Sequence, residues 1–233
     1  VNGTPLNNGL LTLLTNVTLQ TSNFTTSDTS ATATAYLHGC RAQLNGTNFN
    51  TVQAAMDAAA NGQTIRISGV CGDMHQSGGP GQLLTINKDV TLQGGWNSDF
   101  TTFNPASFPT YLDGAGLGRV VYINGNFSPI LENLIIRNGS ASALGGEPAG
   151  KDAGGGLYIN GGTSTFKNVD ITNNQSPDLG AGVYLASPNV INFQGGFVRN
   201  NVSGERGGGL YVDQSAPILT GVNVVGNTAR GGV

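Results

Sequence analysis

Few residues of this chain have the types and spacing that acid–base chemistry requires. Asp73 and His75, within residues 71–75 (CGDMH), come nearest to an acid–base pair, because histidine is the usual proton-transfer residue near neutral pH. Both lie in a glycine-rich segment, where an isolated Asp-x-His is far more often an ordinary loop. His38, just before Cys40, forms no further pattern. We therefore interpret these residues as parts of loops and not as catalysts.

The other charged candidates do not predict a catalytic group either. Asp170 and Asp213 lie in strand-like segments that recur along the chain, and the corresponding positions of other repeats carry no acid. These positions are Ile135, Phe197 and Asn223 for Asp170, and Asn124, Asn160 and Ala186 for Asp213. Glu147, Lys151 and Asp152 share a glycine-rich insertion. Because carboxylate catalysis needs acids close together, we interpret all of these as solvated surface residues and predict no catalytic site.

Composition argues against several classes of function. Cys40 and Cys71 are too few for a zinc cluster. In a chain rich in Thr, Ser and Asn and poor in Lys, we favour a disulfide formed in an oxidising compartment, with two buried thiols as the alternative. Scattered basic residues and a net charge of −3 argue against a nucleic-acid partner. No apolar run approaches the ~20 residues of a membrane span. We expect no metal, no cofactor and an extracellular or cell-surface location.

A repeat of 26 or 27 residues organises the second half of the chain. Its clearest copies are Gly154–Ile159 (GGGLYI), Gly180–Leu185 (GAGVYL) and Gly207–Val212 (GGGLYV), and Val121–Asn124 (VYIN) keeps the strand without the glycines. A second apolar set, out of phase with the first, comprises Leu131, Phe166, Phe193 and Leu219, with a step of 35 residues where residues 140–153 are inserted. Each repeat then turns through asparagine, at Asn138, Asn173-Asn174, Asn200-Asn201 and Asn227.

Repeats this short can bury an apolar face only by stacking on one another. Parallel strands stack at ~4.8 Å, so equivalent residues form columns, with aliphatic columns inside. Asparagine side chains at the turns can hydrogen-bond to their equivalents and tolerate left-handed backbone. We therefore predict an all-β fold, a right-handed parallel β-helix. A leucine-rich repeat would show Leu-x-x-Leu-x-Leu, and a propeller repeats at ~40 residues or more; neither fits.

The N-terminal part differs from these repeats. We expect residues 1–46, rich in Thr, Ser and Asn, to be a strand-forming extension, and residues 47–233 to be the β-helix. Residues 51–60 predict a helix with Asn50 as its N-cap. This helix would cover the first coil and protect an open sheet edge.

Two segments resemble a known superfamily. The run Phe49–Ala55 (FNTVQAA) through Gly62–Ile67 (GQTIRI) resembles the N-terminal cap and first coil of the pectin-lyase-like right-handed parallel β-helix superfamily. Val90–Phe100 is similar to the segment that follows in large bacterial surface proteins of that class. The resemblance implies the β-helix fold over residues 47–233. It implies no single function, because the superfamily includes polysaccharide lyases, hydrolases, adhesins and passenger domains.

Outward-facing positions suggest two further kinds of site. One column contains Tyr122, Tyr158, Tyr184 and Tyr211. Because each lies between aliphatic residues, its ring should point away from the core. The column is either a ladder that stiffens the sheet or a docking strip for sugar rings, for residues 1–35 or for another subunit. Sequons for N-glycosylation, which should mark surface positions, occur at Asn2, Asn16, Asn23, Asn45, Asn126, Asn138, Asn174 and Asn201.

These observations lead to two functional hypotheses. We favour an extracellular, non-catalytic structural or adhesive glycoprotein, because charge is low and no acid cluster is predicted. A new repeat begins at Gly231, so either the protein continues past Val233 or another chain covers that end, as in a filament or surface assembly. The expected partners are copies of itself, a cell-surface molecule or carbohydrate. The alternative is a polysaccharide lyase or glycoside hydrolase, which rests on fold analogy.

Overall fold

A computed structural model describes residues 39–73, 81–146, 148–187 and 190–231. The chain divides into residues 1–39 and a compact unit of residues 40–233, and only the latter is described below. Its described residues form β-strands and one helix, which confirms the all-β prediction. The compact unit begins before the expected boundary at Thr47, because Arg41–Leu44 already form a strand of the largest sheet.

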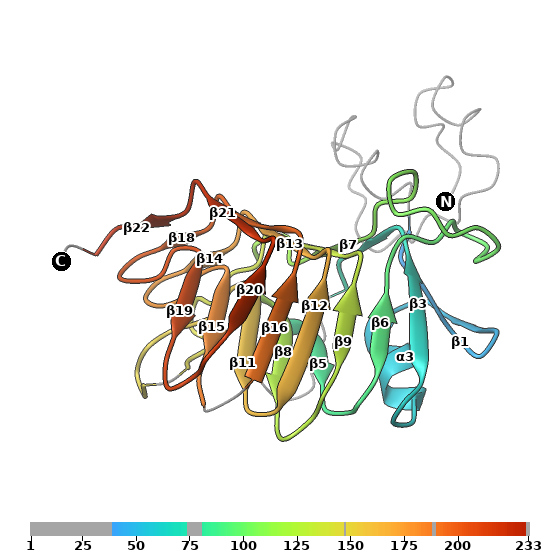
Figure 1. Ribbon diagram of the computed structural model, residues 1–233, viewed down its shortest axis with the longest axis horizontal. Coiled ribbons are helices and arrows are strands. Elements are labelled where there is room, and N and C mark those ends of the chain that lie inside the picture. The colour runs from blue at the N-terminus through green and yellow to red at the C-terminus, as the bar shows by residue number, and fades with distance from the viewer. Residues whose placement is uncertain (1–38, 74–80, 147, 188–189, 232–233) are drawn as a thin grey trace, which may run out of the picture. The chain divides into compact units, whose positions relative to one another are not determined.

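The strands form four sheets (Figure 1). The eight-stranded sheet contains, in spatial order, β2 (Thr47–Phe49), β1 (Arg41–Leu44), β3 (Thr64–Ser68), β6 (Thr91–Gln93), β9 (Ile130–Glu132), β12 (Thr163–Lys167), β16 (Val190–Gln194) and β20 (Ile218–Thr220). The six-stranded sheet contains β21 (Asn223–Val225), β17 (Phe197–Arg199), β13 (Asp170–Thr172), β10 (Ile135–Arg137), β7 (Tyr111–Asp113) and β4 (Val70–Cys71). The five-stranded sheet contains β19 (Leu210–Val212), β15 (Val183–Leu185), β11 (Leu157–Asn160), β8 (Arg119–Asn124) and β5 (Gln82–Ile86). The three-stranded sheet contains β14 (Gln175–Ser176), β18 (Val202–Ser203) and β22 (Thr228–Ala229).

The chain visits the three large sheets in a fixed order. From β3 it passes to β4 in the six-stranded sheet and β5 in the five-stranded sheet, and it then returns to β6 beside β3. We call one such passage a circuit. Strands of successive circuits pair in parallel, as β11 does with β15, whereas β1 pairs antiparallel with both β2 and β3. Every circuit thus adds one strand to each large sheet.

The residues that pair between successive circuits are separated by the repeat spacing found in the sequence. Leu157 pairs with Val183, which pairs with Leu210. The step of 35 residues likewise places Leu131 beside Phe166, because the inserted residues lie outside the strands. Phe166 and Phe193 are buried and their rings stack with centroids 4.7 Å apart. The predicted apolar columns are therefore confirmed in register, but Leu219, the last member of the second column, is 39% exposed. Each fully buried large side chain of the columns contributes roughly 1.5–3 kcal/mol.

At the turns that follow strands of the six-stranded sheet, asparagines adopt positive φ angles and form hydrogen bonds between circuits. Asn138, Asn173 and Asn200 have positive φ angles of 53°, 57° and 54°, a conformation that asparagine tolerates. Asn174 and Asn201, the residues that follow Asn173 and Asn200, belong to a buried amide ladder. In it, Asn201 Oδ1 accepts from both the main-chain nitrogen and Nδ2 of Asn174, at 2.9 Å each. Asn227 Oδ1 accepts from Asn201 in the same way. The hydrogen bonding predicted between equivalent asparagines is confirmed for these residues.

The helix α3 (Val52–Ala58) lies where the eight- and five-stranded sheets begin, against β1, β3 and β5 (Figure 1). The predicted N-cap at Asn50 is wrong, because Thr51 is the residue whose hydroxyl accepts from the Ala54 nitrogen, at 3.1 Å. The helix also ends earlier than predicted, since Ala59 is extended and leads toward β3. Gln53 completes the cover, because its Oε1 accepts from Thr85 N of the edge strand β5 at 2.8 Å.

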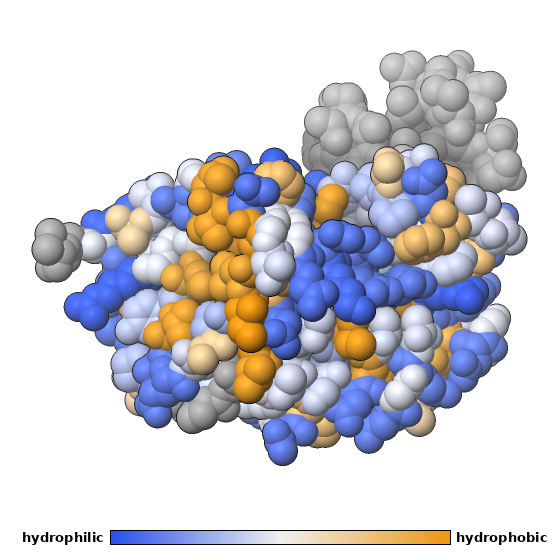
Figure 2. All heavy atoms as spheres, viewed as in Figure 1, coloured by the Kyte–Doolittle hydropathy of each residue, from blue (hydrophilic) through white to orange (hydrophobic). Residues whose placement is uncertain are grey.

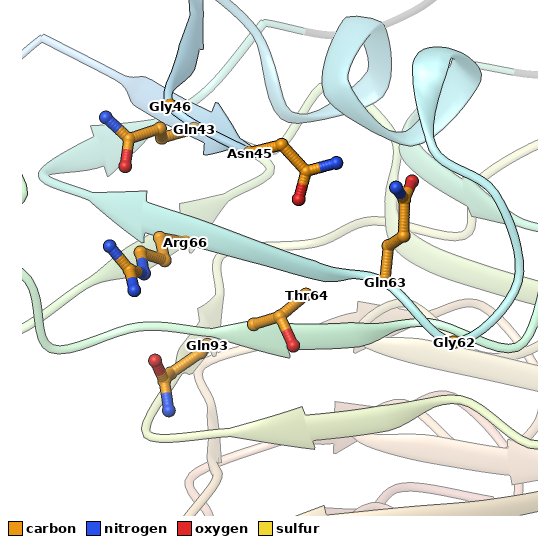
Figure 3. Close-up of a pocket in the computed structure, with 8 residues that line it drawn as sticks. All are labelled: Gln43, Asn45, Gly46, Gly62, Gln63, Thr64, Arg66 and Gln93. Carbon is orange, nitrogen blue, oxygen red and sulfur yellow. The ribbon is translucent and has the colours of Figure 1, made fainter.

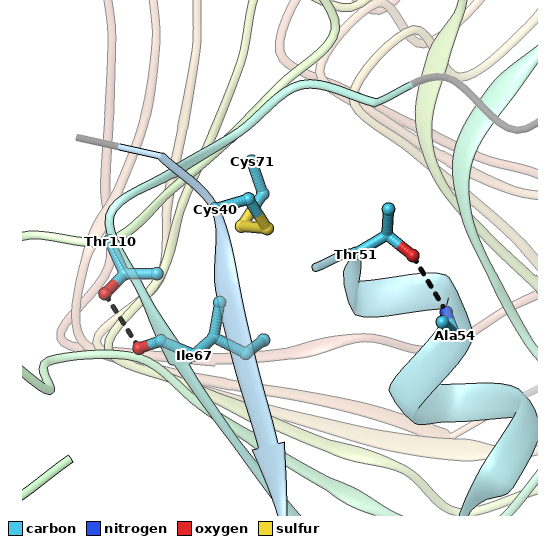
Figure 4. The surroundings of a disulfide bond; sticks show 6 residues. All are labelled: Cys40, Thr51, Ala54, Ile67, Cys71 and Thr110. Carbon is cyan, nitrogen blue, oxygen red and sulfur yellow. Dashed lines mark hydrogen bonds between the residues drawn. A yellow bond between two sulfur atoms is a disulfide. The ribbon is translucent and has the colours of Figure 1, made fainter. Parts of the chain in front are cut away.

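A disulfide joins Cys40 to Cys71 and confirms the favoured interpretation of the two cysteines. Figure 4 shows it together with the capping bond of α3. Cys40 precedes β1 and Cys71 ends β4, so the bond ties the antiparallel hairpin to the six-stranded sheet. Thr110 lies nearby and donates to the main-chain oxygen of Ile67 at 3.2 Å. The first circuit is therefore held by covalent and hydrogen bonds as well as by packing.

Candidate functional site

A polar groove of about 700 Å³ opens at the β1–β3–β6 end of the eight-stranded sheet (Figure 3). It is lined by Gln43, Asn45, Gly46, Gly62, Gln63, Thr64, Arg66 and Gln93. Three of these residues form one row across the sheet, because Gln43 pairs with Arg66 and Arg66 pairs with Gln93. The residues on either side of Arg66, Ile65 and Ile67, are buried in the core, so Arg66 must face outward. The groove thus lies on the outer face of the sheet.

Arg66 is the charged group of this groove, and an aromatic residue fixes its position. Its guanidinium carbon lies 4.3 Å from the centroid of the Trp96 ring. Trp96 is held in turn by a 2.9 Å bond from Nε1 to Gln93 Oε1 and by a tilted contact with Phe103, at 5.3 Å between ring centroids. Gln93 Nε2 donates to Glu132 at 2.6 Å. Among the described residues Arg66 forms no ion pair, so its donors face the groove uncompensated.

A second charged group contains the insertion residues Lys151 and Asp152. Leu179 forms isolated parallel β-bridges with Ala153 and with Arg206. The residues that precede these three, Asp152, Asp178 and Glu205, therefore lie in one column on successive circuits. Lys151 Nζ contacts Asp178 Oδ1 at 3.4 Å and also Glu205 Oε1. Asp178 and Glu205 were not predicted as site residues. Their repeat positions were visible in the sequence, but the insertion that supplies Lys151 and Asp152 follows no repeat.

This group holds the insertion in place. The Asp152 carboxylate accepts from the main-chain nitrogens of Ala143 and Gly145, both at 2.8 Å. The hydrogen bond to Glu205, supported by Asp178, raises the pKa of Lys151. A lysine that acts as a general base needs the opposite shift, toward neutral pH. The arrangement therefore favours a structural ion cluster. Glu147, the remaining charged residue of the insertion, lies outside the described residues.

Asp170 lies on the outer face of the six-stranded sheet, in register with Ile135. Its carboxylate accepts from the Phe197 nitrogen at 3.1 Å and contacts Arg199 at 3.5 Å. Burial raises the pKa of Asp170, and the positive charge of Arg199 partly opposes this shift. The strand register places Ile135, Phe197 and Asn223 in the same column as Asp170. Asp170 therefore has no carboxylate partner in its column.

Of the remaining acid–base candidates, the structure describes Asp213 and Asp73. Asp213 follows β19, and its main-chain nitrogen donates to Leu185 at 2.9 Å. Asp73 is exposed after β4. His75 and His38 lie outside the described residues, so the pairing of Asp73 with His75 stays untested.

The tyrosine column forms as predicted but is largely covered. Ring centroids of successive members, Tyr122, Tyr158, Tyr184 and Tyr211, lie 5.1 to 5.5 Å apart. Tyr158 and Tyr184 are only 4% and 0% exposed, because Ala153 and Leu179 pack over them from outside the five-stranded sheet. The hypothesis of a docking strip therefore fails at Tyr158 and Tyr184, where the residues that connect the sheets already cover the rings. The stacking is instead that of an aromatic ladder within a second, smaller core.

A buried arginine that the sequence did not indicate closes this smaller core. Arg119 is 3% exposed and lies 4.6 Å from the Tyr158 ring centroid. Its guanidinium donates to the main-chain oxygens of Gly145, Ala153 and Gly154, at 2.7 to 3.0 Å. Burial lowers the pKa of Arg119 to about 10, so it remains protonated at neutral pH. The three acceptors lie within the inserted segment or directly after it, which points to a structural role.

The sequons fall into three groups. Asn45 and Asn126 are exposed and Asn138 is half-buried. Asn174 and Asn201 are fully buried in the amide ladder, so the expectation that they mark surface positions is wrong. A glycan there would displace hydrogen bonds that join circuits. Asn2, Asn16 and Asn23 lie outside the described residues.

Metal and membrane interactions gain no support from the described ranges. Within them, no three His, Cys, Asp or Glu side chains come together in a way that could hold a metal ion. No described helix is long and apolar enough to span a bilayer. Comparisons with protein-family models, with curated proteins and with solved structures find no match to this chain.

Proposed function

We propose that this chain is a right-handed parallel β-helix of the pectin-lyase-like type, with a non-catalytic structural or adhesive function outside the cell. The repeated circuit through three sheets supports the architecture, because parallel strands are connected with right-handed crossovers in ≈ 98% of cases. The N-terminal helix and first coil resemble that superfamily in sequence. The disulfide supports an oxidising compartment such as the cell exterior.

The observation that carries the proposed function is an apolar patch on the later strands. We define the patch as Val190, Phe197, Ile218 and Val225, which are 37% to 55% exposed. Figure 2 shows apolar residues gathered over β16, β20 and β21, while the surface toward β6 and β9 is more hydrophilic. Val190 faces outward and pairs with the polar Thr163 of the preceding circuit. Contiguous apolar patches of this kind mark contact surfaces, and we infer that copies of the chain associate through this one.

Sedimentation equilibrium over a wide concentration range tests this association. We expect the intact chain to associate reversibly, and the double variant Val190→Thr, Ile218→Thr to remain monomeric at concentrations where the wild type does not. Leu117→Thr is the matched control, because Leu117 is 72% exposed in the turn between β7 and β8, outside the patch. A wild-type chain that stays monomeric throughout, or a double variant that associates like the wild type, would contradict the proposal.

A polysaccharide lyase or glycoside hydrolase is the second candidate. It rests on fold analogy, and it is tested at Asp178 and Glu205, the acids from adjacent circuits that share the ammonium of Lys151 in the ion cluster. Uronate and neutral polysaccharides would be assayed for unsaturated products and for new reducing ends. Turnover that is abolished by Asp178→Asn or Glu205→Gln, while the fold is retained, would replace the non-catalytic proposal with this one.

A further inference from the structure

We propose that the groove beside Arg66 binds an anionic carbohydrate, a sugar that carries carboxylate or sulfate groups, with Arg66 as the anion-binding residue. The inference deepens the proposed adhesive function and rests on it, since a ligand held here is bound and not converted. The groove involves none of the residues of the apolar patch. The two sites can therefore be tested separately.

Charge is the first argument. The Arg66 side chain is half-buried, stacked on Trp96, and forms no ion pair with any described residue. The guanidinium is planar and always protonated, and it offers up to five donors in a fork that matches the oxygens of a carboxylate or similar anion. Stacking occupies the face of the guanidinium and leaves the donors at its edge free. The Arg66 guanidinium is therefore available to bind an external anion.

Preorganisation is the second argument. Trp96 is fixed by Gln93 and Phe103, and Gln93 is fixed by Glu132. These residues come from β6, β9 and the segment between β6 and β7, so several elements cooperate to hold one guanidinium. Because the side chain is already oriented, binding an anion costs little additional rotamer entropy. Trp96 is therefore a positioning residue, which acts through Arg66.

The remaining lining indicates that the anion is carried by a hydroxyl-rich molecule. Apart from glycines it consists of amide and hydroxyl side chains, with no apolar side chain. Gln63 uses its oxygen to accept from the Ala60 nitrogen at 2.7 Å, and its amide nitrogen has no partner among the described residues. Thr64 is exposed at the groove, as Figure 3 shows. A lipid or an apolar peptide would need apolar pockets, whereas sugar hydroxyls match amides and hydroxyls.

The size of the groove agrees with a small ligand or a short stretch of a chain. Its volume of about 700 Å³ lies within the ~300–1,000 Å³ typical of small-molecule sites. The groove lies on an open sheet face, next to a row that continues through Gln93 to Glu132. Glu132 would repel a second anion there, so we expect one anionic group to be bound at Arg66 and neutral rings to extend along the row.

Isothermal titration calorimetry with the intact chain tests the proposal. The probes are a uronate tetrasaccharide, a sulfated tetrasaccharide, an uncharged glucose tetrasaccharide and an acidic peptide of equal charge. We expect one or both anionic sugars to bind, with affinity that falls as salt rises from 0.05 to 0.5 M, because ionic attraction is screened. The two anionic arms identify the charged group. Binding of the neutral sugar as tightly as the anionic ones, equal binding of the peptide, or no binding at all would overturn the proposal.

Variants separate the groove from the rest of the molecule. Arg66→Gln should weaken binding of the anionic sugar at least about tenfold, because a charge-assisted contact is lost, and Arg66→Lys should lie between this variant and the wild type. Arg206→Gln, a change of the same type at an exposed position, should bind normally. Thermal melts establish whether each variant is folded. If Arg66→Gln does not fold, the salt dependence of binding by the wild type still tests the proposal. Unchanged binding by folded Arg66→Gln would contradict the groove proposal. Sedimentation equilibrium tests the apolar patch independently.

Discussion

Single side chains in this protein act between circuits as well as within them. Asn201 joins three circuits, because it accepts from Asn174, donates through Nδ2 to the main-chain oxygen of Ile171 at 3.0 Å, and donates to Asn227. Arg119, in β8, similarly holds the inserted segment through the carbonyl oxygens of Gly145 and Ala153, and it also donates to Gly154 directly after the segment. In both residues every described contact of the polar side chain is internal. Burial of such groups is tolerated because their hydrogen bonds are made.

At this scale we predict that Asn201→Ala lowers the free energy of unfolding by about 2–4 kcal/mol. The substitution removes the acceptor of the buried Asn174 main-chain nitrogen and the Nδ2 donor to the Ile171 oxygen. Each buried group left without a partner costs ~1–3 kcal/mol. Guanidinium denaturation followed by circular dichroism measures the change. Asn192→Ala, an outward-facing asparagine in β16, is the control and should change stability by less than about 0.5 kcal/mol. Equal losses in the two variants would contradict a special role for the ladder.

The element with the clearest separate task is α3. Its buried face, which includes Val52, Ala55 and Met56, covers the core at the start of the stack. Its C-terminal carbonyls receive the ammonium of Lys88, which donates to the main-chain oxygens of Met56, Asp57 and Ala59 at 2.7 to 2.9 Å. Met56 O also accepts from the Ala59 nitrogen, at 3.2 Å. A cation at this position also favours the helix dipole. Lys88 thus ties the cap to the first complete circuit.

We predict that Lys88→Met destabilises the protein by about 1–3 kcal/mol, since the methionine keeps the apolar stem but leaves these carbonyls without their charged donor. Chemical denaturation measures the loss. Amides of residues 52–60 should also exchange with deuterium faster than in the wild type. Lys167→Met, in the outward row of β12, is the control and should leave both observables unchanged. Helix amides that exchange normally in the Lys88 variant would show that the cap is held by packing alone.

The sequence predicts those elements that repeat and fails where the chain departs from the repeat. Columns such as Leu157, Val183 and Leu210 were predictable because parallel pairing conserves the spacing. The burial of Tyr184 was not, because it depends on how the connecting segments fold across the outside of the sheet. The groove was missed for a similar reason. Trp96 lies in the long segment between β6 and β7, so its place over Arg66 follows no period in the sequence.

On the scale of the compact unit, the two ends of the eight-stranded sheet, at β1–β3 and at β16–β20, carry different surfaces. Near β1 and β3 it carries the polar groove, a helical cover and a disulfide, whereas β16 and β20 carry much of the apolar patch. Interactions in stacked repeats are mainly between neighbours, so stability varies along the stack. β20 and β21 each pair with one strand on one side only, at the edges of their sheets. All residues of both strands are exposed. The proposed association would therefore protect the least stable part of the described stack.

Hydrogen exchange measured by mass spectrometry should reveal this gradient. In dilute protein, we expect amides of residues 218–225 to exchange at least about tenfold faster than those of residues 130–137, because local opening there breaks fewer contacts. Raising the protein concentration should slow exchange at residues 218–225 and leave residues 130–137 unchanged, since only the former lie at the proposed contact. The Val190→Thr, Ile218→Thr variant is the control, and in it the concentration effect should disappear. Uniform exchange along the stack would contradict the stability gradient. A gradient that does not change with protein concentration would support the gradient but contradict self-association through the patch.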